Sequence, residues 1–422
     1  MSLVTPARPR RLLAVALSLT AVAAVSGCGA FDPPRAQPCA WLDRGSDAAD
    51  GTRSQTVVLA DRSPSTRPDK ATPEDRVPDW AATLLDAQEL ALPALEGGNL
   101  SVAGFDGTRA TVNWEVNRTL VTPVTGNDTL KKDRRSGRRG CLEKRLRQLS
   151  AEAPSTGRTD VLGALAAADD QLGTGHGRRR IVVATDGLTN TGCADLRSAG
   201  FDGTAEIEET VRRCREAGEL PDLTGTEVNL VGIGRAARGG VPSSPQTAWL
   251  AAFWSRLCKA TGASSCAVAA TARVREAGAD NGTARTEPQV TFPAVAQRSA
   301  GRVTTIVLPG SVLFATDRAE LSKAARDTLD EAARRIADLD PLSVAISGHT
   351  DSRGTEQRGR QLSSARAQAV RAALAERGIA VASARGYSDD RPRCTPEYRD
   401  GVPDYAAMAC NRRVEIAVTV RR

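Results

Sequence analysis

The chain of 422 residues contains only two histidines and no Cys-x-x-Cys pair. After residue 25 it also has no apolar run long enough to cross a membrane. His176 lies in a loop rich in glycine and arginine, and His349 lies in a GHTDSRG run, so neither a Ser-His-Asp or Cys-His catalytic group nor a zinc cluster can be assembled. We therefore predict a protein that is not an enzyme. Two carboxylates acting as a glycosidase pair remain the alternative.

The excess of positive over negative charge is also small. The formal net charge is +7, and residues 1–27 contain three arginines and no acid, so the chain without them carries +4. This weak and scattered excess argues against a nucleic-acid partner. The hydrophobic content of 41% is sufficient for true cores, and the length allows two or three domains.

Residues 1–27 have the features of a secretion signal, because arginines precede an apolar run at 12–25 that is too short to span a bilayer. The following Val25-Ser26-Gly27-Cys28 resembles the lipobox at which bacterial lipoproteins are cleaved. The resemblance implies that Cys28 is lipidated and becomes the first residue of a mature protein held at the membrane. An ordinary cleaved signal, with Cys28 in a disulfide, is the alternative.

The nine cysteines form an odd set, and lipidation of Cys28 leaves eight that can all pair in an oxidising compartment. Eight cysteines allow 105 connectivities. Cys394 and Cys410 are the only two in the C-terminal segment and are the first expected pair. Proximity and elimination then favour three further pairs: Cys258 with Cys266, Cys193 with Cys214, and Cys39 with Cys141.

Short apolar strands alternate with amphipathic helix-length segments over residues 55–275, which predicts a doubly wound α/β sheet. Asp106-Gly107 is expected to form the turn of an antiparallel hairpin at the sheet edge. Residues 28–54 are predicted to be a tether and residues 276–300 a linker, because both lack periodicity. Strands are expected at 56–60, 100–105, 110–116, 181–185 and 228–233, and helices at 80–90, 161–172, 205–217 and 249–260.

A second domain, of α+β type, is predicted over residues 301–422. Its first helix is marked by a stripe of apolar residues from Leu321 to Ile336 at steps of four and three. A second helix is expected at 361–376, and strands at 303–308, 312–315, 342–346, 381–386 and 414–420.

Several motifs of this second domain occur in an order typical of one family. They are Phe314, GHTDSRG at 348–354, Leu362-Ser363, Arg366-Ala367, Gly386-Tyr387 and the run 411–416. Residues 301–422 thereby resemble the OmpA-like peptidoglycan-binding domain of outer-membrane and lipoprotein anchors. The family usually has Asn where this chain has Gly359, so one side-chain hydrogen bond is missing. The resemblance implies that a peptidoglycan stem peptide is bound by Thr350, Asp351, Arg366 and Arg412.

The chemistry of these residues suits such a ligand. Diaminopimelate, a component of the stem, carries an ammonium and a carboxylate on one carbon. Asp351 can accept from the ammonium, and Arg366 can bind the carboxylate through two parallel N–H bonds, which lysine cannot reproduce. Backbone amides near Thr350 add donors, and Arg412 can assist with the carboxylate. The alternative is that Asp351 and Arg366 pair with each other and lock the loop onto the helix.

In the first domain, Asp61, Ser63 and Ser65 form a DxSxS run after the strand at 56–60. With Thr159, and with Asp186 after the strand at 181–185, they resemble the metal-ion-dependent adhesion site of von Willebrand factor type A domains over residues 54–275. The resemblance implies direct binding of an ion, usually Mg²⁺, by Ser63 and Ser65. Thr159 would bind it directly or through water, and Asp61 and Asp186 through water. Pro64 departs from the small residue that the family prefers.

Hard oxygen ligands at the ends of sheet strands suit a small hard cation with an open coordination position, which a carboxylate of a partner can fill. Taken together, these features predict an extracytoplasmic lipoprotein, attached to the cell membrane through Cys28 and associated with the cell wall. It would bind peptidoglycan without covalent chemistry and present its metal-dependent domain to an unidentified protein partner. A cell-wall-active hydrolase, or a purely structural envelope protein with an empty metal site, is the alternative.

Overall fold

The computed structural model describes residues 39–46, 51–68, 75–238, 240–277, 285–315, 317–323 and 325–421. The predicted signal segment and Cys28 lie outside the described residues. Within the described ranges, no helix has both the length and the apolar character that a membrane crossing requires.

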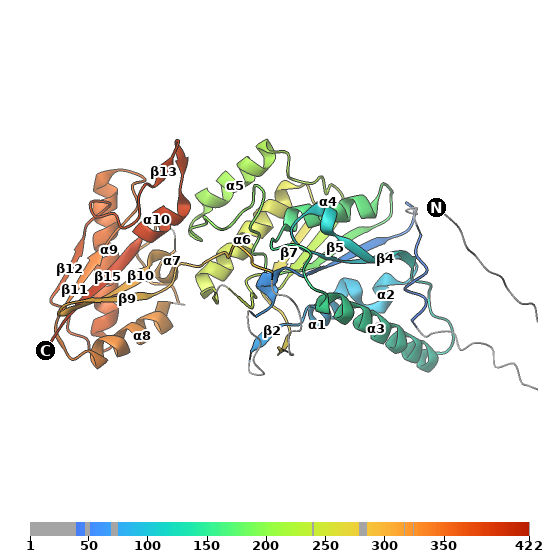
Figure 1. Ribbon diagram of the computed structural model, residues 1–422, viewed down its shortest axis with the longest axis horizontal. Helices are drawn as coiled ribbons and strands as arrows, with labels where there is room; N and C mark the ends of the chain where they lie inside the picture. Colours follow the sequence, from blue (N-terminus) through green and yellow to red (C-terminus); the bar gives the residue numbers. More distant parts are fainter. Residues whose placement is uncertain are drawn as a thin grey trace, which may run out of the picture. The chain divides into compact units, whose positions relative to one another are not determined.

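The N-terminal domain is built on a six-stranded mixed sheet with the strand order β4-β3-β1-β5-β6-β7 (Figure 1). All neighbouring strands are parallel except β4, which is antiparallel to β3 at one edge. The predicted α/β class and the antiparallel edge are therefore confirmed. The strands are β1 (Gln55–Asp61), β3 (Asn99–Phe105), β4 (Asn113–Leu120), β5 (Arg179–Ala184), β6 (Thr226–Val231) and β7 (Ser265–Ala269), and a separate pair joins β2 (Arg76–Pro78) to β8 (Val274–Glu276).

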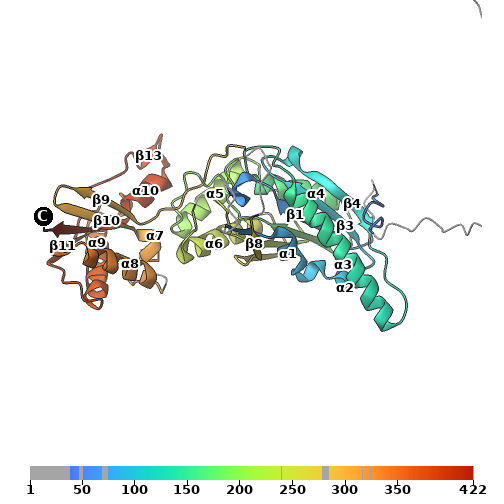
Figure 2. The same ribbon diagram turned by 60° about the horizontal axis from the view of Figure 1, so that its bottom comes forward.

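Two apolar cores cover the two faces of this sheet because side chains alternate along each strand. Val57 and Leu59 of β1 pack into one core, and Val58 and Ala60 pack into the other. The first core is closed by α4 (Val161–Leu172), α5 (Thr204–Glu216) and α6 (Ser244–Ala260), and the second by α1 (Trp80–Leu85), α2 (Leu92–Leu95) and α3 (Asp128–Ala151). Figure 1 and Figure 2 show α3 on the face that also carries α1.

The connection between β3 and β4 is longer than the predicted two-residue turn. It contains the short 3₁₀ helix η3 (Arg109–Thr111), so the predicted strand at 110–116 begins only at Asn113. Asp106 holds this loop, because its carboxylate accepts hydrogen bonds from the backbone N–H groups of Gly107 at 2.6 Å and Thr156 at 3.1 Å. The predicted helix at 80–90 is similarly divided into α1 and η2 (Gln88–Leu90). A third 3₁₀ helix, η1 (Pro64–Thr66), follows β1.

Four disulfides connect the elements, and they are the four predicted pairs. Cys39–Cys141 ties the segment before β1 to α3, and Cys193–Cys214 ties a loop to α5. Cys258–Cys266 joins α6 to β7, and Cys394–Cys410 closes a loop of the C-terminal domain. Cross-links of this kind stabilise the folded state mainly by restricting the unfolded chain.

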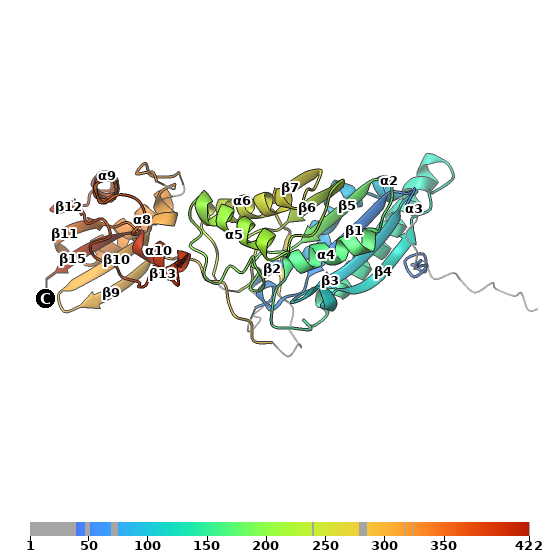
Figure 3. The same ribbon diagram turned by 90° about the horizontal axis from the view of Figure 1, so that it is seen from above.

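The C-terminal domain contains a five-stranded sheet with the strand order β12-β11-β15-β10-β9. Helices α8 (Ala325–Asp338) and α9 (Glu356–Ala375) pack on one face of it, as Figure 3 shows. The strands are β9 (Ala296–Ala300), β10 (Val303–Pro309), β11 (Pro341–Gly348), β12 (Ser383–Gly386) and β15 (Arg413–Val420). The remaining elements are α7 (Gly310–Leu313), α10 (Tyr405–Asn411), β13 (Tyr398–Arg399) and β14 (Val402–Pro403).

Two features differ from the predicted arrangement of this domain. The strand predicted at 312–315 is wrong, because Phe314 N donates to Gly310 O at 2.9 Å and closes the helical turn α7. Strand β9 lies within the segment predicted as a linker and pairs antiparallel with β10. All five residues of β9 (AQRSA) are exposed. The sequence has no apolar alternation that would indicate a strand.

Glu206 on α5 gives the stability of the fold a testable dependence on pH. Burial raises the pKa of Glu206 to about 7, although Gly200 N donates to Oε1 at 2.8 Å. Since the folded pKa lies above the ordinary 4.5, the folded state keeps a proton that the unfolded state loses, and stability should fall as the pH rises from about 4.5 to about 7. Glu206→Gln should reduce this fall by on the order of 3 kcal/mol, measured by urea unfolding at pH 5 and pH 7.5.

The matched control is Glu208→Gln, which removes the same charge from the exposed side of α5, where Glu208 pairs with Arg256 at 2.7 Å. That pairing lowers the pKa of Glu208, so the variant should retain the full fall in stability. An unchanged pH profile in Glu206→Gln would contradict the assignment.

Candidate functional site

The loop after β11 and the helix α9 are held together by close backbone contact. Gly348 ends β11, and a Cβ atom at this position would lie 2.1 Å from the carbonyl oxygen of Ser363 on α9. At Gly386 of β12, a Cβ atom would lie 2.2 Å from the backbone N of Ser364. Only glycine permits this approach. The contact fixes the side chains of α9, including Arg366, relative to the loop that carries Asp351.

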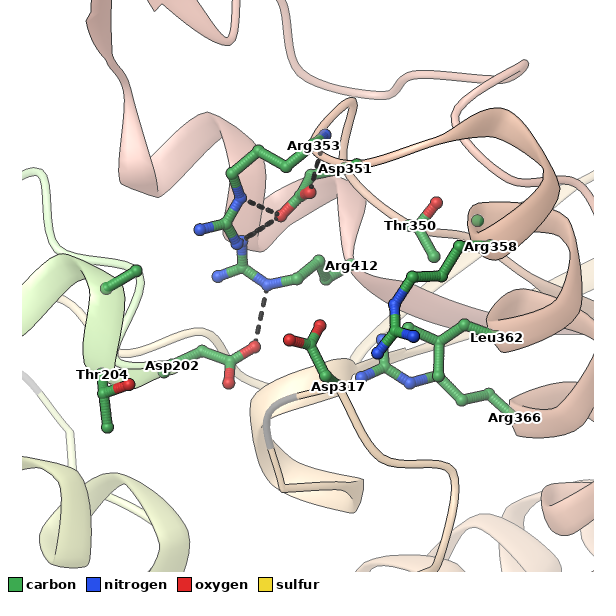
Figure 4. Close-up of a pocket in the computed structure, with 14 residues that line it drawn as sticks. Asp202, Thr204, Asp317, Thr350, Asp351, Arg353, Arg358, Leu362, Arg366 and Arg412 are labelled. Atoms are coloured by element: carbon green, nitrogen blue, oxygen red, sulfur yellow. Dashed lines mark hydrogen bonds and ion pairs between the residues drawn. The ribbon is translucent and has the colours of Figure 1, made fainter.

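Asp351 is a buried carboxylate whose hydrogen bonds come mainly from two arginines (Figure 4). Its Oδ2 accepts from Arg412 Nη1 at 2.5 Å and from Arg353 Nη2 at 2.7 Å. Burial opposes ionisation, but the hydrogen bonds from Arg353 and the charge of Arg412 hold the pKa of Asp351 below its usual value. Asp351 is therefore ionised at neutral pH. The alternative prediction, in which Asp351 pairs with Arg366, does not describe this arrangement, because its ion pairs are with Arg412 and Arg353.

Arg366 projects from α9 and is only 3% exposed. Its Nε donates to the carbonyl oxygen of Arg318 at 2.9 Å, and its guanidinium lies 5.1 Å from the ring centre of Phe314. Among the described residues, neither Nη atom has a hydrogen-bond partner. Figure 4 shows the guanidinium extending towards Asp317 in the cavity. The guanidinium of Arg366 is thus held by Arg318 and Phe314, and its two Nη atoms are available to a ligand.

These side chains share one cavity of about 260 Å³. The hydroxyl of Thr350 lines it and is buried without a hydrogen-bond partner. Arg412 also donates from Nε to Asp202, at 2.8 Å, and residues 202–205 border the cavity. The structure therefore brings together all four residues predicted to bind peptidoglycan, Thr350, Asp351, Arg366 and Arg412.

The space beside Gly359 is filled by a neighbouring side chain. A Cβ atom at Gly359 would lie 2.2 Å from the hydroxyl oxygen of Ser388 and 3.3 Å from that of Thr350. Ser388 therefore occupies the space that a larger side chain at position 359 would need. His349 lies beside this region and stacks on Tyr387 with ring centres 5.7 Å apart. Burial, together with the nearby Arg413, lowers the pKa of His349 to about 4.

The five residues of the predicted metal site meet at the carboxyl ends of β1 and β5, and all are buried. Asp61 Oδ1 accepts from the hydroxyl of Ser63 at 2.5 Å, and that hydroxyl lies 3.0 Å from the hydroxyl of Ser65. Asp186 Oδ1 accepts from Leu188 N at 2.9 Å, whereas its Oδ2 is buried with no hydrogen-bond partner. Parallel strands β1 and β5 are neighbours, which explains why segments distant in sequence converge here.

This donor set fits a small hard cation. It offers two carboxylates and three hydroxyls, and one buried carboxylate oxygen of Asp186 lacks any compensating donor. Within the part of the chain that the structure describes, no group of three or more His, Cys, Asp or Glu side chains is placed to hold a metal. A cation at this site would therefore depend on the hydroxyls as well as on the acids. Burial and the neighbouring Asp186 raise the pKa of Asp61 to about 7, and burial raises the pKa of Asp186 to about 6.

Sequence reasoning missed a further acid at this site. Glu287 lies in the segment predicted as a linker, yet its Oε1 accepts from the hydroxyl of Thr159 at 2.8 Å. Asn190 Nδ2 donates to the same oxygen at 2.8 Å. Burial raises the pKa of Glu287 to about 7, and the charge of Asp61 acts in the same direction. Neither periodicity nor a motif around Glu287 indicated this position.

Comparison with known proteins identifies one part of the chain. The model of the OmpA family matches residues 313–399. Outer membrane protein A of Shigella flexneri is 36% identical over 136 residues, which are 30% of this chain and 39% of that protein. Photosystem I P700 chlorophyll a apoprotein A2 of Gloeobacter violaceus is 31% identical over 115 residues, 27% of this chain and 13% of that protein.

Among solved structures, the cell wall anchor of the T6SS from Pseudomonas aeruginosa is 30% identical, with 30% of this chain and 88% of that chain covered and a TM-score of 0.26. The family model and the curated relatives show that the C-terminal region contains an OmpA-like domain, as predicted. The chain spans well under half the length of the two curated relatives named above.

The glycine contact between β11 and α9 can be tested directly. Gly348→Ala should destabilise the C-terminal domain by roughly 1–3 kcal/mol, because the new methyl group meets the backbone oxygen of Ser363, which cannot move without shifting the helix. Chemical unfolding followed by circular dichroism measures the loss. Gly137→Ala in α3 adds the same methyl group where nothing lies within 4 Å, and it should be neutral or stabilising. Equal stabilities of wild type and Gly348→Ala would show that the helix is not held by this contact.

Proposed function

We propose that the protein binds peptidoglycan stem peptides through the cavity of its OmpA-like domain, and that it is attached to the membrane through a lipid on Cys28. The observation that carries the proposal is the Arg366 fork, which has both Nη atoms unpaired among the described residues and shares its cavity with Asp351. Unpaired N–H groups on a largely buried guanidinium are costly, and a ligand carboxylate would compensate them.

The geometry suits a ligand that carries an ammonium and a carboxylate on one carbon. Arg366 binds the carboxylate with its two Nη atoms, and Asp351, which is ionised, accepts from the ammonium. Arg412 and Arg353 keep Asp351 ionised, and the free hydroxyl of Thr350 offers one further polar contact. Binding of this kind is non-covalent and needs no catalytic base. Such binding would attach a protein of the cell envelope to the cell wall.

Purified sacculi test this proposal. The full mature chain should sediment with sacculi, and Asp351→Ala combined with Arg366→Ala should weaken its retention at least about tenfold. A charge-assisted bidentate pair is worth roughly 1.5–3 kcal/mol, which corresponds to that factor or more. Arg366→Lys should be weakened too, because lysine keeps the charge but loses the fork.

The control for the double variant removes one acid and one arginine elsewhere in the same domain. Asp330 pairs with Arg377 at 2.6 Å, and neither residue lines the cavity. Asp330→Ala with Arg377→Ala should therefore leave retention unchanged. Retention of the Asp351→Ala, Arg366→Ala variant at the wild-type level would remove the proposed binding mode.

The N-terminal domain is proposed to hold a divalent cation, Mg²⁺ or a similar ion, at Asp61, Ser63, Ser65, Thr159 and Asp186. Support comes from the unpartnered Oδ2 of Asp186 and from the mixture of carboxylates and hydroxyls, which are hard oxygen ligands. A cation bound there would offer a coordination position to a carboxylate of a protein partner. The resemblance to type A domains consists of these five residues. The proposed protein partner depends on a cation being bound by them.

Calorimetric titration of the full mature chain with Mg²⁺ and Mn²⁺ tests the site. The wild type should bind one ion, and Asp61→Ala should abolish the binding heat, because removal of one buried acid leaves too few negative ligands. Asp86→Ala, which breaks an exposed pair with Arg273, should bind like the wild type. Heats that are the same for wild type and Asp61→Ala would refute the metal site.

A further inference from the structure

The segment from Arg285 to the start of β9 is fastened to the N-terminal domain at several points. Arg285 Nε donates to Pro154 O at 3.1 Å, and Gln246 Nε2 donates to Pro293 O at 2.8 Å. Val290 is buried in the core beneath α4, α5 and α6, and the ring of Phe292 lies 4.6 Å from that of Phe201. The segment therefore lies in a defined path across the end of the sheet where the proposed metal site is found.

Within this path, Glu287 directs its carboxylate at the proposed site. It accepts hydrogen bonds from Thr159, which is one of the five proposed ligands, and from Asn190. Asn190 also donates to the carbonyl oxygen of Pro288 at 3.2 Å, so the backbone directly after Glu287 is held as well. A small cavity of about 10 Å³ lies between the segment and the site, and Ser65, Asn190, Arg238 and Glu287 are among the residues that line it. That volume is comparable to the space needed for one water molecule or ion.

The acids around the proposed site form no ion pair with any described residue, so a bound cation would compensate their charge. Glu287 forms no ion pair with any described residue, and Asp61 and Asp186 likewise receive hydrogen bonds only from hydroxyl and amide groups. The second carboxylate oxygen of Asp186, in a residue with no exposed surface, has no partner. Asp351 in the C-terminal domain, by contrast, is compensated by Arg412. A bound cation would compensate these acids only together with the hydroxyl ligands, since no three acids alone are placed to hold a metal among the described residues.

We infer that Glu287 is an internal ligand of the cation site, supplying from the chain itself the carboxylate that an acidic protein partner would otherwise supply. This inference rests on the proposed cation site. In the structure, the Glu287 carboxylate holds the position beside Thr159 and Ser65 that a partner must enter. An acidic partner therefore binds only when it displaces Glu287, and the segment acts as a built-in competitor.

Mn²⁺ binding by the full mature chain tests the inference with a readout that a purely structural role would not change. Glu287→Gln keeps an oxygen that can accept from Thr159 and Asn190 but removes the charge. It should weaken Mn²⁺ binding roughly tenfold or more. It should also raise the water-proton relaxation enhancement of the bound Mn²⁺, because a water molecule replaces the lost carboxylate.

Two variants make the outcomes distinct. Glu276→Gln removes an exposed acid of β8, paired with Arg76 at 3.3 Å, and should match the wild type in both affinity and relaxation. If Asp61→Ala abolishes Mn²⁺ binding while Glu287→Gln leaves affinity and relaxation unchanged, the cation site stands and the role of Glu287 is overturned. If the wild-type chain binds no Mn²⁺, both the site and its internal ligand are overturned.

Discussion

A carboxylate can be buried only where cations or hydrogen-bond donors compensate its charge, and this constraint shapes both candidate sites. In the C-terminal domain the compensation is internal, because Asp351 is neutralised by Arg412 and Arg353. In the N-terminal domain Asp61 and Asp186 receive only hydroxyl and amide donors, and one oxygen of Asp186 receives none. The charge of Asp351 is thus balanced within the protein. In the proposed cation site, a bound ion would supply the balance that arginines supply at Asp351.

The β-sheets are the scaffold for both sites, and the sequence was informative about them. Buried parallel strands are continuous apolar runs, so β1, β3, β5 and β6 were predicted to within about two residues. Because the ends of neighbouring parallel strands meet, the DxSxS run and Asp186 could be placed together without a structure. In the C-terminal domain the motifs after β11, along α9 and before β15 gave the residues of the cavity, Thr350, Asp351, Arg366 and Arg412.

The missed features share a physical cause, namely that their partners are distant in sequence. Helix α3 was not predicted because it is dominated by arginine and lysine and buries few side chains, and its disulfide partner Cys39 lies far away in the sequence. The ion pair of Asp351 with Arg412 was not predicted for a similar reason. Arg366 has the spacing of an ion-pair partner, but Arg412 follows α10 and reaches Asp351 only through the pairing of β11 with β15. Glu287 lies in a segment without periodicity, and only packing on Thr159 and Asn190 reveals it.

An internal carboxylate at the proposed cation site would change which partners that site can select. A competitor tied to the same chain is always present at high effective concentration, so a weak external acid gains little from the open coordination position alone. The apparent affinity of a partner equals its intrinsic affinity multiplied by the fraction of molecules in which Glu287 is released. A partner must therefore gain further contacts outside the metal, on the loops that carry Ser65 and Asn190, before it displaces the internal ligand. On this reasoning, the segment before β9 makes the site respond to an extended complementary surface rather than to carboxylates in general.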